Sequence, residues 1–259
     1  MKNKKISIIV VSLNTRIDFI KTIKSIKKQN YNNYEIIVID GNSTDGTKEE
    51  IIKRKEIISK YIIEKDKGIY HAMNKGIQLS NGEWIIFMNS GDVFFRNNIL
   101  DKFLSEDKKN YDIVYGDTQI INKNLKYIVK SRTFDHNTCL MPFCHQSVFV
   151  RSNILKKKNF SLKFKISSDF NFFYHCFISG KKFKKIDLII SKVKPGGLAD
   201  TNRQKVFNEN IKIFYKKKSY PEIVFLVYYK IFEFIKISVK FFLPFKLIKY
   251  VLKIKYYKS

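Results

Sequence analysis

Two polar segments that follow apolar runs carry side chains able to bind a nucleotide and a divalent cation. They are VIDGNSTDGT (38–47) and FMNSGD (87–92). A carboxylate at a strand's end, such as Asp40, can accept a nucleobase N–H or a ribose hydroxyl, and small residues after it let a ligand approach the backbone. Asp92 can hold Mg²⁺ or Mn²⁺ against a diphosphate, because these cations favour oxygen ligands and Mg²⁺ often takes only one or two carboxylates.

Two further segments offer a phosphate site and a general base, namely EKDKGIYHAMNKG (64–76) and ISSDF (166–170). Asp66, Lys67 and Gly68 form a polar loop before a helix expected near Tyr70, and a helix N-terminus beside a lysine suits phosphate. Asp169 lies between small and aromatic residues, surroundings that suit a general base. Each of the four segments, taken alone, also fits an ordinary turn or a capped helix.

The residues between these segments predict the elements that carry them. Continuous apolar runs indicate strands covered on both faces, and isoleucines at helical spacing indicate amphipathic helices. Alternation of strands and helices predicts a mostly parallel α/β sheet with right-handed crossovers, whose ligands lie at the carboxyl ends of the strands. We expect strands at 6–11, 35–40, 61–64 and 83–89, and helices at 17–26 and 70–80.

The second half of the chain follows a different pattern. YDIVYGD (111–117) and LKYIVK (125–130) predict a small antiparallel extension, and 171–178 predicts a buried helix. We therefore expect a catalytic domain at 1–200, with a donor-binding half at about 1–110 and an acceptor-binding half at about 111–200. A basic, amphipathic helical region at 201–259, broken or kinked at Pro244, is expected to follow.

The composition limits the classes of protein to consider. The 259 residues include 50 Lys and Arg against 23 Asp and Glu, a formal net charge of +27, which attracts nucleic acid, acidic membranes or phosphorylated substrates. Lysine is abundant throughout the chain, so part of this charge is compositional. The three cysteines indicate no disulfide framework and fit a reducing compartment. The first apolar stretch is too short for a signal peptide, and no run of ~20 apolar residues predicts a spanning helix.

In their order and spacing the four segments resemble family 2 glycosyltransferases, over roughly Lys5 to Ala199. ISIIVVSLN (6–14) is similar to that family's first strand and nucleotide-contacting loop, and FMNSGD occupies the place of its metal-binding DxD element. The resemblance implies a GT-A fold, which is Rossmann-like, with Mn²⁺ or Mg²⁺ on Asp92. It implies donor contacts from Ser12, Leu13, Asn14, Asp40, Asn42, Asp66, Lys67, Gly68, Asn74, Ser90 and Gly91.

YDIVYGD, CHQSVF (144–149), FKISSDF and KPGGLA (194–199) further resemble a subgroup that builds bacterial surface polysaccharides of the colanic acid, O-antigen or capsule type. The resemblance gives the role of catalytic base to Asp169. Candidate contacts to the acceptor or diphosphate are His145, Gln146, Gly196 and Gly197. The implied reaction transfers a sugar, with inversion, from a nucleotide sugar to a hydroxyl of a glycan or a polyprenyl-diphosphate-linked saccharide. A UDP-sugar is the first expectation and a dTDP-sugar the second.

The sequence departs from the family at three positions. Acids are frequent in the family where Asn89 and Gly91 stand, so Asp92 remains as the strong metal ligand. Many members have arginine where Met73 stands, and Lys67 or Lys75 would have to meet the diphosphate instead.

The lysine-rich, aromatic segment 221–258 suits an anionic membrane interface. We expect a cytoplasmic protein that is peripheral on the inner face of the cell membrane; the alternative is that these helices pack on the catalytic domain.

A nucleotidyltransferase would begin with a glycine-rich phosphate loop, whereas SLNTR (12–16) has no glycine. A nucleic-acid-binding protein would show basic residues clustered beside stacking aromatics in a recognisable module, which we do not find, so no nucleic acid partner is expected.

Overall fold

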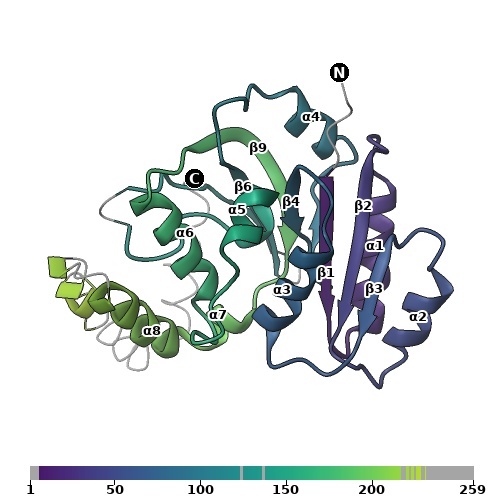
Figure 1. Ribbon diagram of the computed structural model, residues 1–259, viewed down its shortest axis with the longest axis horizontal. Coiled ribbons are helices and arrows are strands. Elements are labelled where there is room, and N and C mark those ends of the chain that lie inside the picture. Colours follow the sequence, from purple (N-terminus) through teal and green to yellow (C-terminus); the bar gives the residue numbers. More distant parts are fainter. Residues whose placement is uncertain are drawn as a thin grey trace.

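The computed structural model describes residues 6–122, 125–135 and 138–216, together with 220, 221, 223, 224, 226–228 and 231 (Figure 1). The strands are β1 (Ile6–Ser12), β2 (Tyr34–Asp40), β3 (Lys60–Ile63), β4 (Trp84–Phe87), β5 (Val93–Phe94), β6 (Ile113–Asn122), β7 (Leu125–Val129), β8 (Val148–Arg151) and β9 (Phe183–Val193). The helices are α1 (Arg16–Lys27), α2 (Thr47–Lys53), α3 (Ile69–Leu79), α4 (Ile99–Ser105), the 3-10 turn η1 (His145–Ser147), α5 (Ser152–Lys157), α6 (Ser168–Ile178), α7 (Leu198–Thr201) and α8 (Arg203–Lys216).

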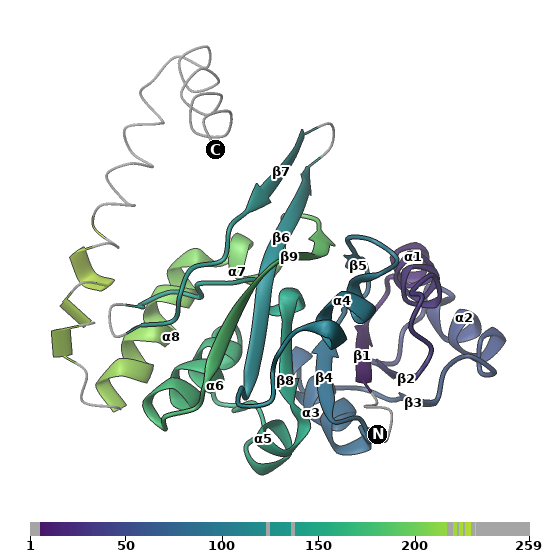
Figure 2. The same cartoon turned by 90° about the horizontal axis from the view of Figure 1, so that it is seen from above.

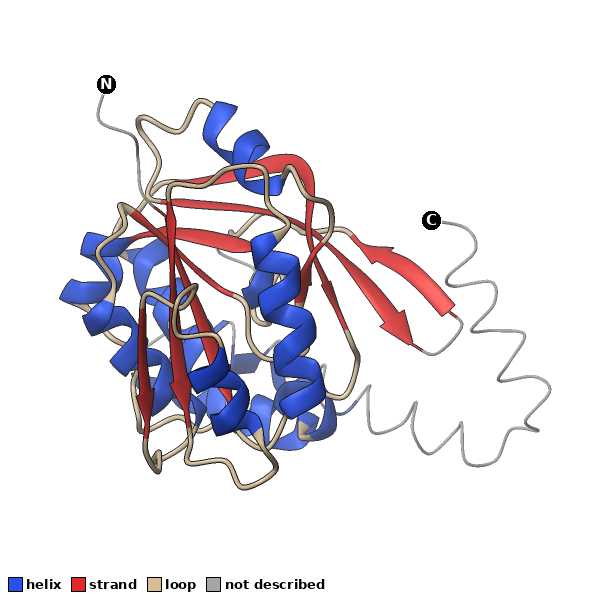
Figure 3. Ribbon diagram, turned by 90° about the vertical axis from the view of Figure 1, so that its right-hand side faces the viewer, coloured by secondary structure: helices blue, strands red, loops and turns tan. Residues whose placement is uncertain are grey.

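The strands of the described part join in one sheet in the order β3-β2-β1-β4-β8-β6-β9-β5, with β7 paired to β6. Strands β1 to β4 run parallel to one another, β8 is antiparallel to both β4 and β6, and β9 is parallel to β6. Helices cover both faces of this sheet (Figure 3), and the β6–β7 hairpin projects beyond it (Figure 2). The expected α/β architecture with an antiparallel extension is confirmed.

The period of β1 explains why the sheet has two cores. Ile9 packs in one cluster with Ile77 of α3, and Ile8 and Val10 pack in the other with Phe19 of α1. Because successive side chains of a strand point to opposite faces, a continuous apolar run fills both clusters. Helix α3 lies so close to β1 that a Cβ added at Gly76 would stand 2.5 Å from Ile9 Cγ2, which explains the glycine at this position.

Helix α8 belongs to the body of the molecule. Phe207, Ile213 and Phe214 are buried in the same cluster as the aromatic residues of α6, and Asn210 Nδ2 donates to the carbonyl of Cys139 at 3.0 Å. For 203–216, therefore, the helix packs on the catalytic domain. Most of the expected membrane segment 221–258, with Pro244, lies outside the described residues. Within the described ranges no helix is long and apolar enough to cross a membrane.

Candidate active site

The carboxyl ends of β1, β2 and β4 meet at one edge of the sheet, as the sequence predicts. Ser12 pairs with Asp40 in the register of β1 and β2. The chain after β4 continues along β1, because Ser90 N donates to Val11 O at 3.1 Å. The segments that begin at Ser12, Asp40 and Asn89 thus lie side by side at the edge where ligands of such sheets bind.

The buried carboxylate of Asp40 holds the loops of this edge together through hydrogen bonds. Its side chain is fully buried, and its carboxylate accepts the Ser12 hydroxyl at 2.8 Å, Ser43 N at 2.7 Å and the Ser43 hydroxyl at 2.6 Å. In this arrangement Asp40 orders the loops after β1 and β2. The surface that faces solvent comes instead from Leu13, which is 58% exposed, and from Asn14 and Asn42, which are exposed. Both asparagines have positive φ, 51° and 71°, a conformation that asparagine tolerates better than most residues.

Asp66, after β3, joins a small charged cluster. Lys75 Nζ lies 2.6 Å from Asp66 Oδ1 and 2.6 Å from Glu64 Oε1, and His71 Nδ1 lies 2.9 Å from Asp66 Oδ1. Asp66 Oδ2 is buried without a hydrogen-bond partner among the described residues and faces Gly41, whose added Cβ would stand 3.7 Å away. The ammonium group of Lys75 is therefore engaged in ion pairs with Glu64 and Asp66.

Lys67 and Gly68 occupy the exposed start of α3. Gly68 has a φ of 115°, which only glycine adopts without strain, and both residues are exposed. Of the two lysines considered for the diphosphate, Lys67 is thus the accessible one. Asn74 has a different environment from the one expected: its amide donates to Phe160 O and accepts from Phe160 N, both at 2.9 Å. Asn74 ties α3 to the segment before α6, so its amide is used within the protein.

Asp92 lies in a turn that α1 holds in place. The Thr22 hydroxyl donates to Asp92 O at 2.8 Å and accepts from Gly91 N at 2.9 Å, and Gly91 has a φ of 102°. Ser90 lies in the same turn, half-buried, with its hydroxyl 3.4 Å from Thr15 O. Burial raises the pKa of the Asp92 carboxyl to about 7; a hydrogen bond from Gln146 opposes this shift.

Asp169 stands in the first turn of α6 with its two oxygens in different environments. Oδ1 accepts Phe170 N at 2.8 Å and the Tyr70 hydroxyl at 2.9 Å. Oδ2 lies 3.9 Å from His145 Nδ1. The turn before Asp169 is held by Glu209 of α8, which accepts the backbone N–H of Ser167 at 2.8 Å.

The η1 turn lies between the two carboxylates. Cys144 Sγ donates to Gln146 Oε1 at 2.8 Å, which turns the amide nitrogen of Gln146 toward Asp92. Burial raises the pKa of the Cys144 thiol to about 12, and the charges of Asp92 and Asp169 both add to the shift. Two neighbouring residues of η1 thus contact the two carboxylates, Gln146 by its hydrogen bond to Asp92 and His145 by its Nδ1, 3.9 Å from Asp169 Oδ2. Burial lowers the pKa of His145, whose ring packs against Phe87 with centroids 4.9 Å apart, so His145 is neutral.

The glycine-containing loop after β9 is exposed and contacts α1 through an ion pair. Gly196, with a φ of 99°, donates its N–H to Asp200 Oδ2 at 3.1 Å, and Gly197 precedes α7. Lys194 Nζ lies 2.8 Å from Asp18 Oδ1 on α1, and this ion pair lowers the pKa of Asp18. The loop is thus tied to the helix that also holds the Asp92 turn.

The model of glycosyl transferase family 2 matches residues 7–186, a range that includes Asp40, Asp66, Asp92 and Asp169 and ends before the glycine loop, α7 and α8. The chain belongs to glycosyl transferase family 2. This membership makes the protein a glycosyltransferase and decides against both a nucleotidyltransferase and a non-enzymatic binding protein.

Curated family 2 relatives cover different shares of the chain. A PGL/p-HBAD biosynthesis glycosyltransferase of Mycobacterium bovis is 27% identical over 212 residues, which cover 78% of this chain and 81% of that protein. WfgD of Escherichia coli, a UDP-Glc:alpha-D-GlcNAc-diphosphoundecaprenol beta-1,3-glucosyltransferase, is 30% identical over 125 residues, which cover 48% of this chain and 49% of WfgD.

Solved structures confirm the GT-A fold. TarS 1–349 of S. aureus matches with a TM-score of 0.64 and 16% identity, covering 85% of this chain and 70% of that one. The mannosyltransferase PcManGT of Pyrobaculum calidifontis, in complex with GDP-Man and Mn²⁺, matches with a TM-score of 0.63 and 15% identity, covering 83% and 64%. At such identities the likeness concerns the fold.

The residues of this glycosyltransferase fit a divalent cation shared with a diphosphate. Asn89 Oδ1, three residues before Asp92, is buried without a hydrogen-bond partner in the described part of the chain. An amide oxygen and a carboxylate are both ligands that Mg²⁺ and Mn²⁺ accept. Within the same residues no group of three or more His, Cys, Asp or Glu side chains could hold a metal. The remaining ligands of a cation here would come from phosphate and water.

Two residues that shape the site were not among those expected from the sequence. Tyr70 lies inside the DKGIYHAMNKG segment, but only its contact with Asp169, 99 residues away, reveals its position. Glu209 lies in the C-terminal region, where the sequence signal is one of charge and amphipathicity.

Proposed function

We propose that this glycosyltransferase transfers a sugar, with inversion, from a UDP-sugar to a hydroxyl of a glycan or a polyprenyl-diphosphate-linked saccharide. The observation that carries the proposal is that neighbouring residues of η1 contact both carboxylates. Gln146 hydrogen-bonds Asp92, and His145 Nδ1 lies 3.9 Å from Asp169 Oδ2. One carboxylate beside the leaving diphosphate and one beside the attacking hydroxyl are what a single displacement requires.

The donor would lie over the edge formed by the loops after β1, β2 and β3. Leu13, Asn14 and Asn42 offer the exposed surface for base and ribose, and Asp40 with Ser12 holds that surface in shape. Lys67 and the N-terminus of α3 at Gly68 would face the diphosphate, since a helix N-terminus favours negative charge. The preference for UDP is supported by the name of WfgD, which takes UDP-Glc. The GT-A fold itself is compatible with several nucleotides, since PcManGT was solved with GDP-Man.

Asp92 and Asn89 would hold Mn²⁺ or Mg²⁺ together with the donor diphosphate, and Gln146 would orient the Asp92 carboxylate. A bound cation neutralises charge that grows on the leaving diphosphate. Ser90 and Gly91 complete the turn that brings these oxygens to the edge.

Asp169 would accept the proton of the acceptor hydroxyl as the hydroxyl oxygen attacks the anomeric carbon. The new carbon–oxygen bond forms on the face opposite the breaking bond to the diphosphate, which leaves as UDP with the electron pair of that bond. One displacement inverts the anomeric centre and needs no covalent intermediate with the protein. His145 borders the same space, and the loop of Gly196 and Gly197 would border the acceptor.

The acceptor class rests on the relatives. WfgD acts by name on a diphosphoundecaprenol-linked sugar, and the mycobacterial relative serves PGL/p-HBAD biosynthesis. A role in surface polysaccharide assembly, with the protein peripheral on the inner face of the membrane, follows from the same chemistry.

We further propose that the catalytic unit extends through α8. Because Phe214 is fully buried, a truncation that tests membrane binding should remove only 232–259. Unchanged partition between membrane and soluble fractions would refute membrane binding by that segment.

A donor panel tests the proposed donor class. Melting curves are recorded with UDP-, dTDP- and GDP-sugars, each with and without Mn²⁺. We expect stabilisation by a UDP-sugar that depends on Mn²⁺, because ligands that bind the native state raise its melting temperature. Stabilisation by GDP- or dTDP-sugars alone would overturn the UDP assignment. The anomeric configuration of the product, read by NMR, should be opposite to that of the donor; retention would overturn the single displacement.

A further inference from the structure

The two oxygens of Asp169 are not equivalent, and the difference suggests which one acts. Oδ1 receives two donors, Phe170 N at 2.8 Å and the Tyr70 hydroxyl at 2.9 Å. A carboxylate oxygen has two lone pairs in its plane, so these donors occupy Oδ1. Oδ2 lies 3.9 Å from His145 Nδ1, beyond the length of a hydrogen bond.

Oδ2 keeps its capacity to accept a proton. The Asp169 side chain is 21% exposed, so a hydroxyl can approach it, whereas the His145 side chain is 10% exposed. Neither ring nitrogen of His145 has a hydrogen-bond partner among the described residues. Burial lowers the pKa of His145, which favours the neutral ring over a positive charge beside Oδ2.

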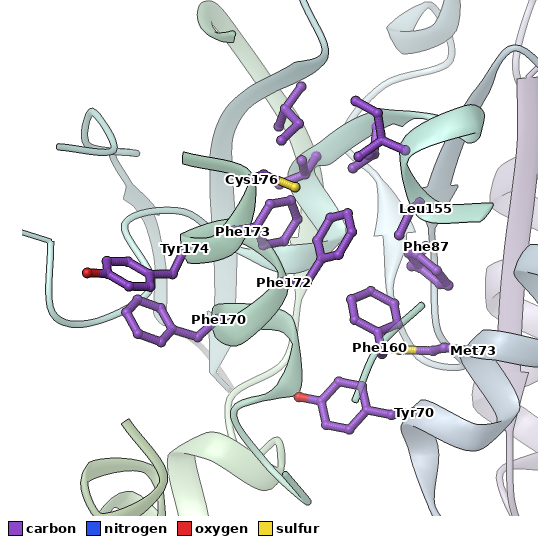
Figure 4. Packing of buried hydrophobic residues seen from close by; sticks show 14 of the residues in the cluster. Tyr70, Met73, Phe87, Leu155, Phe160, Phe170, Phe172, Phe173, Tyr174 and Cys176 are labelled. Atoms are coloured by element: carbon purple, nitrogen blue, oxygen red, sulfur yellow. The ribbon is translucent and has the colours of Figure 1, made fainter. Parts of the chain in front are cut away.

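We propose that Tyr70 is a positioning residue that holds Oδ1 of Asp169 and so presents Oδ2 to the acceptor hydroxyl. The inference rests on the proposed function, in which Asp169 is the base, and identifies the residue that aims it. The Tyr70 hydroxyl points toward the start of α6 (Figure 4) and also lies 2.5 Å from Ile166 O. The single proton of this hydroxyl is shared between Ile166 O and Asp169 Oδ1, which belong to the same turn, so one hydroxyl clamps the turn that carries the base.

Tyr70 is suited to this role by its protonation and its rigidity. Burial, together with the charge of Asp169, raises its pKa well above the usual range, so the phenol remains a donor. Its ring packs against Phe160 with centroids 5.5 Å apart, and Phe160 is itself fixed by the amide of Asn74. A buried aromatic ring that is already packed loses little further freedom when its hydroxyl makes a bond.

Tyr70 also sets the base relative to the donor. It stands two residues after Gly68, at the start of α3, where the diphosphate is proposed to bind. The residue that aims the base therefore belongs to the helix that meets the donor. Alignment of an attacking group within a narrow range of position is what converts binding into rate.

Tyr70→Phe tests the proposal because it removes one oxygen and keeps the ring. With the UDP-sugar selected in the donor panel, we expect kcat to fall about tenfold to a hundredfold, part of the 10²–10⁴ that a positioned base contributes. The donor KM should stay within about twofold. This split between kcat and the donor KM is a readout that a merely structural role of Tyr70 would not produce. Tyr61→Phe, on the exposed edge strand β3, is the matched control and should change none of these quantities.

An unchanged kcat in Tyr70→Phe would overturn the proposal. The outcome is separable from the proposed function through Asp169→Asn. Loss of activity in Asp169→Asn with normal Tyr70→Phe refutes the clamp alone, whereas an active Asp169→Asn refutes the base itself. Should Tyr70→Phe fail to fold, difluorotyrosine at position 70 keeps the hydroxyl and makes it a stronger donor. A changed kcat with an unchanged donor KM is then expected, and an unchanged kcat would refute the role of Tyr70.

Discussion

The carboxylate of Glu209 accepts the backbone N–H of Ser167 at 2.8 Å, two residues before Asp169. The same carboxylate accepts the N–H groups of Lys165 at 2.9 Å and Ile166 at 3.0 Å. Helix α6 has no side-chain cap of its own at Ser167. A residue of α8 therefore satisfies donors at the start of the helix that carries the proposed base, which links the C-terminal region to the active site.

Glu209→Ala should weaken both the fold and the reaction. Three backbone donors lose a charged acceptor, which should cost about 1–3 kcal/mol of unfolding free energy. The Asp169 turn should loosen, so transfer should fall by a larger factor than donor affinity. Glu209→Gln keeps one acceptor oxygen, so its stability and its transfer rate should lie between those of the parent protein and those of Glu209→Ala. Denaturant melts, UDP titrations and rate measurements on both variants check this order. Glu49→Ala, an exposed glutamate of α2, is the control; equal effects in both alanine variants would contradict the account.

The orphaned amide oxygen of Asn89 predicts its part in cation binding. Asn89→Ala removes a neutral oxygen ligand and should weaken Mn²⁺ binding in the presence of UDP by about tenfold, at the lower end of the effects seen around metal sites. Asn89→Asp adds a negative charge and should tighten it. Mn²⁺ titrations followed by electron paramagnetic resonance measure both changes. Asn97→Ala, an exposed asparagine further along the same segment, should leave the affinity unchanged. Identical Mn²⁺ affinities in all three variants would rule out Asn89 as a ligand.

Asp92 should make the stability of the metal-free protein depend on pH. Its pKa is raised from 3.8 to about 7, chiefly by burial, so the folded state disfavours the ionised form. The contribution of Asp92 to the free energy of unfolding is most favourable below about pH 4, and it is lost as the pH rises to 7. Asp92→Asn removes this loss and should therefore raise the melting temperature more at pH 8 than at pH 5. An Asp92→Asn variant that is less stable than the parent at both pH values would contradict burial as the cause of the raised Asp92 pKa.

Much of the donor half follows from the sequence because its signals are local. The apolar runs of β1 and β2 and the helical spacing of α1 each lie within about ten residues, and strand alternation fixes which loops meet at the carboxyl edge. Asp92 could be found for the same reason, since it follows a buried strand directly.

The contacts that organise the second half are not local. Tyr70 meets Asp169 across 99 residues, and Glu209 meets Ser167 across 42. Strand β9 mixes lysines with apolar residues and shifts its register against β6, so no clear period marks it. The amide of Asn74 resembles a ligand-binding group in the sequence, and only the position of Phe160 shows that its bonds are internal.

The most direct test of the account is Asp169→Asn, which keeps the shape of the side chain and removes the base. We measure UDP release from the donor selected by the panel, and the dissociation constant for UDP, on the same preparations. The control is Asp101→Asn on α4, which lies apart from α6 at the top of Figure 1. We predict that Asp169→Asn slows UDP release by 10²- to 10⁴-fold, as loss of a general base does, while UDP affinity stays within about threefold. Retention of most of the activity in Asp169→Asn would contradict the central claim.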